Sequence, residues 1–196
     1  MYPGNNKMTT FYKNISLYVS TYAKYSAGNL DGIWLNFDEY PNFPALWQAL
    51  VKYHADEVQP EFMCQEVQGV DFTVPESIRA VDLLFLYRLS RDEDAEILST
   101  FLALEPGEAP ELPGGMSTCE FAALFDDFKA RAMSAYAGRL DEVGWTQYPD
   151  FSDWAFTQFL AANPQLAEWE HYLDAETIAR EASFKYTEKN GLIFHR

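Results

Sequence analysis

The sequence has few of the residues from which covalent, metal-bound and membrane-spanning structures are built. Its two cysteines, Cys64 and Cys119, form no Cys-x-x-Cys pair, so a disulfide framework is excluded and a reducing, cytoplasmic location is expected. The three histidines show neither metalloprotease nor zinc-finger spacing, so we expect no metal site. No apolar run approaches the roughly 18 residues of a membrane-spanning helix, and we expect no membrane partner.

Enzyme motifs are also missing. The sequence contains no Gly-x-Ser-x-Gly nucleophile elbow, no phosphate-binding loop and no dinucleotide fingerprint. We therefore predict that the protein is not an enzyme and has no catalytic residues and no cofactor. One enzymatic alternative stays open, a hydrolase that uses two carboxylates. It rests on little, because a chance pairing is expected among 30 acids.

Basic residues are scarce as well. There are 14 Lys and Arg against 30 Asp and Glu, which gives a formal net charge of −16. Nucleic acids and anionic lipids are polyanions, so this charge argues against binding either directly. A partner with a basic surface would suit it. On charge alone, however, an ordinary acidic and soluble protein is the better explanation.

Aromatic residues, in contrast, are abundant. The chain has 15 Phe, 12 Tyr and 5 Trp, and 48% of its 196 residues are hydrophobic. Such a composition argues against disorder, and the length suffices for one domain or for two to three small ones.

The first part of the chain, residues 1–72, is predicted to be a small sheet with one helix. Alternating, β-rich segments predict three strands, at residues 15–22, from residue 32 onward and at 61–67. Residues 44–54 have the apolar spacing of a helix. Gly28 and Gly32 punctuate a polar segment between the first two strands, which predicts a turn.

The second part, residues 73–127, is predicted to be an acidic helical bundle. Three sequences have the form of a helix-capping box, at residues 73–76, 90–93 and 117–120. Residues 79–89 are almost entirely apolar, which predicts a buried helix, and residues 92–104 are amphipathic. Residues 105–115 form a loop rich in Pro, Gly and Glu.

The third part, residues 128–196, is predicted to be an α+β unit that ends in a hairpin. Residues 128–132 suggest a short strand or a helix. Helical patterns follow at 152–162, 166–173 and 174–182. Asp174 is a good N-cap for the last helix, and Asn190-Gly191 is a strong hairpin signal. The chain as a whole is therefore predicted to be α+β, with three small domains.

The acidic surplus is concentrated in the second part, which has 12 acids against 3 bases. Helix capping accounts for two or three of the acids near residue 92. A solvated surface is the ordinary explanation for the rest, and a binding face for a basic partner is the sharper one. The candidate acids for such a face are Asp92, Glu93, Asp94, Glu96, Glu105, Glu108, Glu111, Glu120, Asp126 and Asp127.

In several segments the sequence resembles the ArdA antirestriction family. The N-terminal likeness comprises LYV at 17–19, YSAGNL at 25–30, GIW at 32–34, EFMC at 61–64 and VDF at 70–72. The C-terminal likeness comprises YLDAE at 172–176, ARE at 179–181 and GLIF at 191–194. The order and spacing of these segments carry the resemblance. The sequence departs from the family in an N-terminal extension of about ten residues and in the 105–115 loop.

The resemblance implies an antirestriction protein that imitates B-form DNA. Such a protein is an elongated homodimer of three-domain chains, and its acids stand in for phosphates. It competitively occupies the DNA-binding groove of type I restriction–modification enzymes, in their methyltransferase core, and spares incoming mobile DNA. A dimer would carry sixty acids, as many as the phosphates of about 30 base pairs. The first two strands would then serve as a frame for acids presented elsewhere.

We expect dimer contacts in residues 128–196, the least acidic part, because like charges repel on approach. A generic acidic adaptor that binds another basic protein is the alternative, followed by the carboxylate-dependent hydrolase. An enzyme should have a concave pocket with carboxylates of shifted pKa. A mimic should present its acids on a convex surface.

Overall fold

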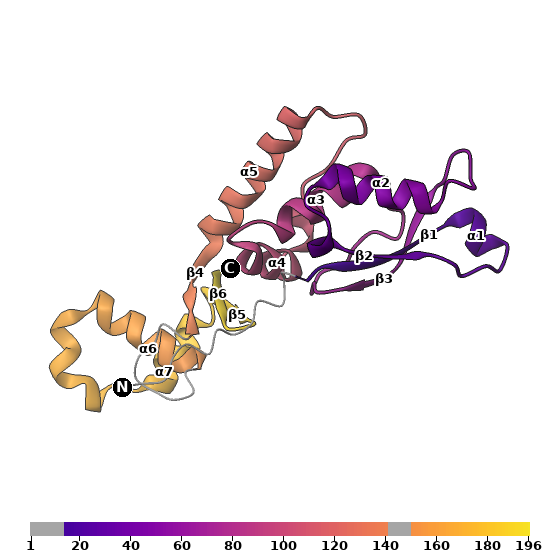
Figure 1. The fold of residues 1–196 in the computed structure, drawn as a ribbon. Helices are drawn as coiled ribbons and strands as arrows, with labels where there is room; N and C mark the ends of the chain where they lie inside the picture. Colours follow the sequence, from indigo (N-terminus) through magenta and orange to yellow (C-terminus); the bar gives the residue numbers. More distant parts are fainter. Residues whose placement is uncertain (1–13, 141–149) are drawn as a thin grey trace, which may run out of the picture. The chain divides into compact units, whose positions relative to one another are not determined.

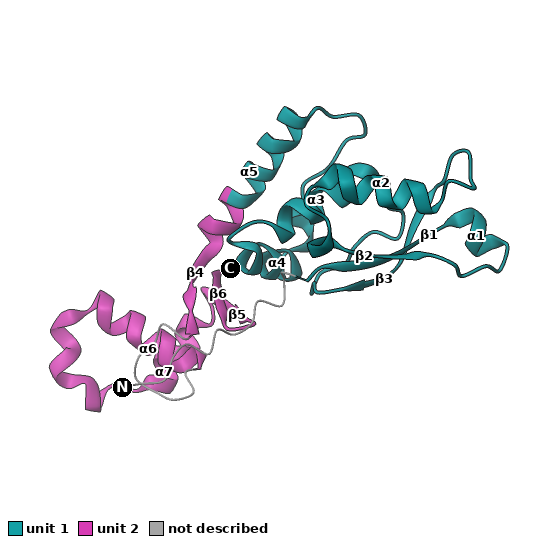
Figure 2. Ribbon diagram, in the orientation of Figure 1, with its two compact units in different colours: residues 1–129 teal, residues 130–196 magenta. Residues whose placement is uncertain are grey.

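The computed structural model describes residues 14–140 and 150–196, which divide into two compact units (Figures 1 and 2). The units comprise Met1–Lys129 and Ala130–Arg196. Each contains one small three-stranded sheet together with helices, so the predicted α+β class is confirmed. The predicted division at residue 72 lies inside the first unit and stays a prediction.

The sheet of the first unit is antiparallel, with strand order β2-β1-β3. Its strands are β1 (Ser16–Thr21), β2 (Ile33–Asn36) and β3 (Phe62–Gln68), close to the predicted positions. Leu17, Val19 and Leu35 are fully buried on one face of this sheet. Figure 1 shows helix α2 (Phe43–Tyr53) along one side of the sheet. The α2 residues Leu46 and Leu50 are fully buried in the same core.

The connection between β1 and β2 is not the simple turn that its glycines suggested. It begins with a short helix, α1 (Tyr22–Ser26), because the Thr21 side chain accepts a hydrogen bond from the Lys24 N–H and caps the first turn. Gly28 then adopts φ 75°, a conformation that favours glycine. A 3-10 turn, η2 (Phe37–Glu39), follows β2.

Helices dominate the rest of the first unit. They are α3 (Ala80–Ser90), α4 (Ala95–Leu104), the 3-10 turn η3 (Pro106–Glu108) and α5 (Thr118–Ala135), which begins in this unit. Phe85 of α3 packs against Phe125 and Phe128 of α5, with ring centroids 5.7 and 5.5 Å apart. Phe121 is also buried, so the spacing 121, 125, 128 gives α5 its apolar stripe. Residues 128–132 therefore belong to a helix, one of the two structures that their pattern allowed.

Two of the three predicted capping boxes are wrong. Glu76 lies outside any helix, and its carbonyl accepts a hydrogen bond of 2.7 Å from the Cys64 N–H, so pairing with β3 takes precedence over helix formation. Ser90 ends α3 and donates to the Tyr87 carbonyl instead of starting a helix. The third box is confirmed, because Ser117 and Glu120 exchange side-chain to backbone hydrogen bonds at the start of α5.

The second unit has its own sheet, in the order β4-β6-β5. Its elements are β4 (Tyr136–Arg139), α6 (Phe151–Ala162), η5 (Pro164–Tyr172), α7 (Ala175–Ala182), β5 (Tyr186–Lys189) and β6 (Leu192–His195). Trp154 of α6 and Ile193 of β6 lie in its core. The Asp174 cap is confirmed by hydrogen bonds from two backbone N–H groups of α7. The Asn190-Gly191 hairpin is confirmed too, with φ 56° and 75°.

Residues 166–173 are helical as predicted, but they lie mostly in a 3-10 helix and not in an α-helix. Pro164 stands in the first turn of this segment. Among the helices of the described ranges, none has both the length and the apolar character needed to cross a membrane.

Candidate partner-binding surface

Two of the predicted binding acids are occupied within the protein. The Lys129 ammonium of α5 lies 2.7 Å from Asp92 Oδ1 and 2.8 Å from Asp94 Oδ2, in the turn before α4. The Asp92 side chain is only 7% exposed. Desolvation alone would lower the pKa of Lys129, but the two carboxylates outweigh it and raise that pKa. The Lys129 side chain therefore stays protonated and positively charged. No local sequence pattern indicates this contact, because Lys129 is 37 residues from Asp92.

Glu120 is held at the N-terminus of α5. Its carboxylate accepts hydrogen bonds from the Ser117 N–H at 2.7 Å and from the Ser117 hydroxyl at 2.8 Å. The backbone hydrogen bond, followed by the hydroxyl, lowers the pKa of Glu120, so the side chain stays ionised well into the acidic range. The residue is exposed. It can therefore cap the helix and still present negative charge to a partner.

The remaining candidates are spread over several segments and are mostly at the surface. Glu96 of α4 and Glu108 of η3 are half-buried and engaged in further interactions. The exposed candidates are Glu93, Glu105, Glu111, Asp126 and Asp127. The structure thus brings Asp92 and Asp94 together around a lysine and leaves an exposed set on the turn before α4, the 105–115 loop and α5.

The first 76 residues contribute exposed acids that the sequence interpretation left out. Several of these acids contact other side chains: Asp31 accepts from Tyr53 at 2.7 Å, Asp56 pairs with Lys24 at 3.2 Å and Asp38 lies 3.8 Å from Arg91. The full exposed set is Asp31, Asp38, Glu39, Asp56, Glu61, Glu66, Asp71 and Glu76. The acidic surface therefore extends beyond the helical region, onto the sheet and its loops.

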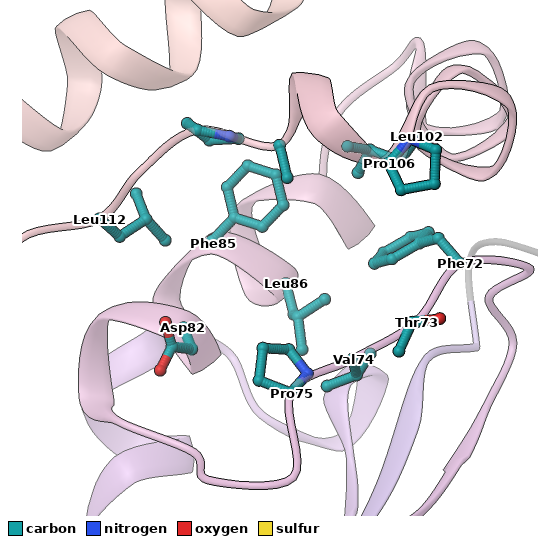
Figure 3. Close-up of a pocket in the computed structure, with 12 residues that line it drawn as sticks. Phe72, Thr73, Val74, Pro75, Asp82, Phe85, Leu86, Leu102, Pro106 and Leu112 are labelled. Atoms are coloured by element: carbon teal, nitrogen blue, oxygen red, sulfur yellow. The ribbon is translucent and has the colours of Figure 1, made fainter.

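An apolar cavity of about 150 Å³ lies beside α3 and the 105–115 loop (Figure 3). Phe72, Leu86 and Leu102 are among its lining residues. Its one carboxylate is Asp82, which binds the Arg79 guanidinium through both oxygens, at 2.9 and 2.6 Å. A carboxylate engaged in this way caps α3 and is not free for acid–base work. This cavity therefore lacks the carboxylate pair that the hydrolase alternative requires.

His54 lies in the cluster of described residues that most resembles a metal site. His54, Asp56 and Glu57 each place one ligand-type atom within 4.8 Å of the others. The Lys24 ammonium already lies 3.2 Å from both His54 Nδ1 and Asp56 Oδ1. Burial and then the Lys24 charge lower the pKa of His54, so its imidazole is neutral at pH 7. This arrangement is explained by the lysine as the resident cation.

Comparison with known families identifies the family of this acidic chain. A family model described as "Antirestriction protein (ArdA)" matches residues 17–192, which is most of the chain. The chain belongs to the ArdA antirestriction family. No curated protein and no solved structure matched it.

Membership confirms the resemblance found in the sequence and implies an antirestriction function. It also implies interaction with restriction–modification enzymes, and the ArdA family is not a family of known enzymes. The matched range covers most of both units and includes the Lys129 contact and all ten candidate acids.

Proposed function

We propose that this ArdA protein is an acidic mimic of B-form DNA that occupies the DNA-binding groove of type I restriction–modification enzymes. Inhibition is then an equilibrium competition, in which no covalent bond is made or broken. The binding groove of such an enzyme presents Lys and Arg to phosphates. Carboxylates at similar spacing engage the same side chains through charge-assisted hydrogen bonds.

The observation that carries this proposal is the placement of the acids. Between residues 14 and 129 there are 20 Asp and Glu against 6 Lys and Arg. Asp82 and Asp92 have largely buried side chains, and the other 18 acids of this range are half-buried or exposed. A folded protein gains nothing in stability from so large a surplus of exposed like charge, because self-repulsion opposes compaction. Binding of a partner with a strongly basic surface would account for this surplus of exposed acids.

The decisive experiment is a competition for DNA. A purified type I methyltransferase core is bound to a labelled target duplex and titrated with the protein. We expect release of the duplex at near-stoichiometric amounts, and release should weaken as salt rises. Inactivation by substoichiometric protein would contradict competition and point to an enzyme. Binding to the core without release of DNA would favour the adaptor alternative.

We also propose that the protein is a homodimer with its contact in the second unit. Three large side chains of this unit are well exposed: Trp169 is 58%, Tyr172 83% and Phe184 76% accessible. Aromatic side chains dominate the energetics of protein interfaces. Sedimentation equilibrium should give about twice the 22.5 kDa chain mass, and Tyr172→Ser with Phe184→Ser should shift it toward the monomer. A wild-type monomer at micromolar concentration would refute the dimer.

A further inference from the structure

We propose that the open face of the β2-β1-β3 sheet holds an arginine side chain of the restriction–modification enzyme. Trp34 and Tyr18 form an aromatic floor, Glu66 supplies a carboxylate opposite Tyr18, and Glu39 supplies another that contacts Asn36, two residues along β2 from Trp34. This inference rests on the proposed function and adds to it a localised contact, distinct from the dispersed acids of the helical region.

The pairing of the strands places three of these residues in one row. Tyr18 of β1 is directly opposite Trp34 of β2 and also directly opposite Glu66 of β3. Directly opposed residues of antiparallel strands project to the same face, and their Cβ atoms are about 5 Å apart. The Tyr18 and Trp34 rings are 5.4 Å apart between centroids and tilted by 47°. The row therefore runs from an indole through a phenol to a carboxylate.

This row lies on the face opposite the sheet's apolar core, where Tyr18 is half-buried and its two partners are exposed. The neighbours of Tyr18 along β1, Leu17 and Val19, point to the other face and are fully buried. Trp34 is 41% exposed, and Glu66 is exposed. An indole left this accessible contributes little to the core, whereas a cation placed over it is attracted by the ring's negative face.

The aromatic floor is held in place before any partner arrives. The Tyr18 hydroxyl donates to the Leu30 carbonyl at 2.9 Å. The Gly32 backbone approaches so closely that a Cβ there would lie 3.0 Å from Tyr18 Cζ and 2.7 Å from the Val19 carbonyl oxygen. A fixed ring loses little conformational entropy on binding, which is a property of interface hot spots.

The flanking carboxylates are likewise oriented by amide donors. Asn36 Nδ2 donates to Glu39 Oε1 at 2.9 Å, and Gln68 Nε2 donates to Glu66 Oε1 at 2.9 Å. Ser16, which lies opposite both Asn36 and Gln68, donates to Asn36 Oδ1. Each carboxylate keeps its second oxygen for another donor. Within residues 14–140 and 150–196, neither glutamate has an ion pair with Lys, Arg or His.

The chemistry of this face selects arginine as the occupant. A guanidinium is planar, stacks on aromatic rings and donates to carboxylates through a rigid fork, whereas an ammonium is more strongly hydrated. The net charge of −16 favours a basic partner, and a basic DNA-binding groove supplies arginines. The sequence interpretation treated this region as a frame alone. The strand pairing, which aligns Trp34, Tyr18 and Glu66, supports a recognition role for this region as well.

The test measures binding of folded variants to the methyltransferase core over a salt series. Trp34→Leu keeps an apolar side chain in β2 but removes the aromatic face, and we expect it to weaken binding about tenfold with little change in the salt dependence. Trp34→Phe keeps a ring and should stay within about threefold of wild type. Glu39→Gln with Glu66→Gln should weaken binding and also reduce the salt dependence.

Val58→Ala is the matched control, since it truncates a fully exposed apolar side chain in the same unit. Near-wild-type binding by Trp34→Leu, with an unchanged circular dichroism spectrum, would overturn this inference. If the leucine variant does not fold, Glu39→Gln with Glu66→Gln decides the matter, because wild-type affinity and salt dependence of that variant would also overturn the inference. If the wild-type protein itself fails to displace DNA, the proposed function fails instead.

Discussion

Lys129 lies 2.7 Å from Asp92 across the first unit, and this ion pair changes which acids are available to a partner. Asp92 and Asp94 look in sequence like two more carboxylates of a mimicking surface. In the folded protein they hold α5 against the turn before α4. Both carboxylates are paired with the Lys129 ammonium inside the protein, so they are less available to a partner.

Replacing this lysine should destabilise the first unit. Lys129→Met keeps an unbranched side chain of similar length but leaves the nearly buried Asp92 carboxylate without its cation, and we expect a loss of about 1–3 kcal/mol. Urea unfolding followed by circular dichroism measures it. Adding Asp92→Asn to Lys129→Met should recover part of the loss. Wild-type stability of the single variant would show that the ion pair contributes nothing.

Stability should fall as pH drops below neutrality because of His54. Its pKa in the folded protein is lowered by burial and by Lys24, so the unfolded chain binds more protons than the folded one. The contribution of the neutral imidazole is fully present above the ordinary histidine pKa of about 6.5. It is lost as pH falls from there toward the lowered folded value.

Thermal melts between pH 5 and 8 test this expectation, with His54→Gln as the comparison. The slope of stability against pH should flatten in the variant over the part of that range below about pH 6.5. Asp56, whose pKa is lowered first by its hydrogen bond with Lys24, loses its contribution only at lower pH. A parallel pH dependence in wild type and variant would assign the acid sensitivity to other groups.

Exposed acids of the helical region should act collectively in binding. Single changes of Glu93, Glu105, Glu111 or Asp126 to Gln or Asn should cost at most about 1 kcal/mol each, because exposed charges are screened. All four together should weaken binding by the summed amount and reduce its salt dependence.

The matched comparison is Asp92→Asn with Asp94→Asn, which alters acids already engaged by Lys129. It should affect folding stability more than affinity, as measured by melting and by the DNA competition. Complete loss of inhibition from one of the four exposed changes, with the fold intact, would indicate a localised hot spot in the helical region.

Gly32 should tolerate substitution poorly, although its φ lies outside the left-handed range. In Gly32→Ala the added Cβ would meet the Val19 carbonyl oxygen at 2.7 Å, so the backbone must shift, at a cost of about 1–3 kcal/mol. Gly28→Ala is the control, since nothing lies within 4 Å of its Cβ and only the positive φ opposes it, costing about 1 kcal/mol. Equal stabilities of the two variants would contradict the close approach.

Local sequence signals predicted much of the secondary structure. The apolar alternation at residues 15–22 and 61–67, the helical spacing at 44–54 and the Asn190-Gly191 turn all depend on neighbours within a few residues, and the structure agrees with them. The Asp174 cap is of the same kind. The ArdA segments were likewise visible in the sequence, and the family match extends over residues 17–192.

Tertiary structure decided what distant residues do to one another. The capping sequence at 73–76 failed because pairing with Met63 and Cys64 satisfies that backbone better than a helix would. Lys129 contacts Asp92 only because α5 packs against the rest of the first unit. The row of Trp34, Tyr18 and Glu66 exists because β1 lies between β2 and β3, and burial of the sheet's apolar face selects the register that turns these three residues away from the core. Composition alone determined the acidity of the protein, but the fold determined which of its acids face solvent.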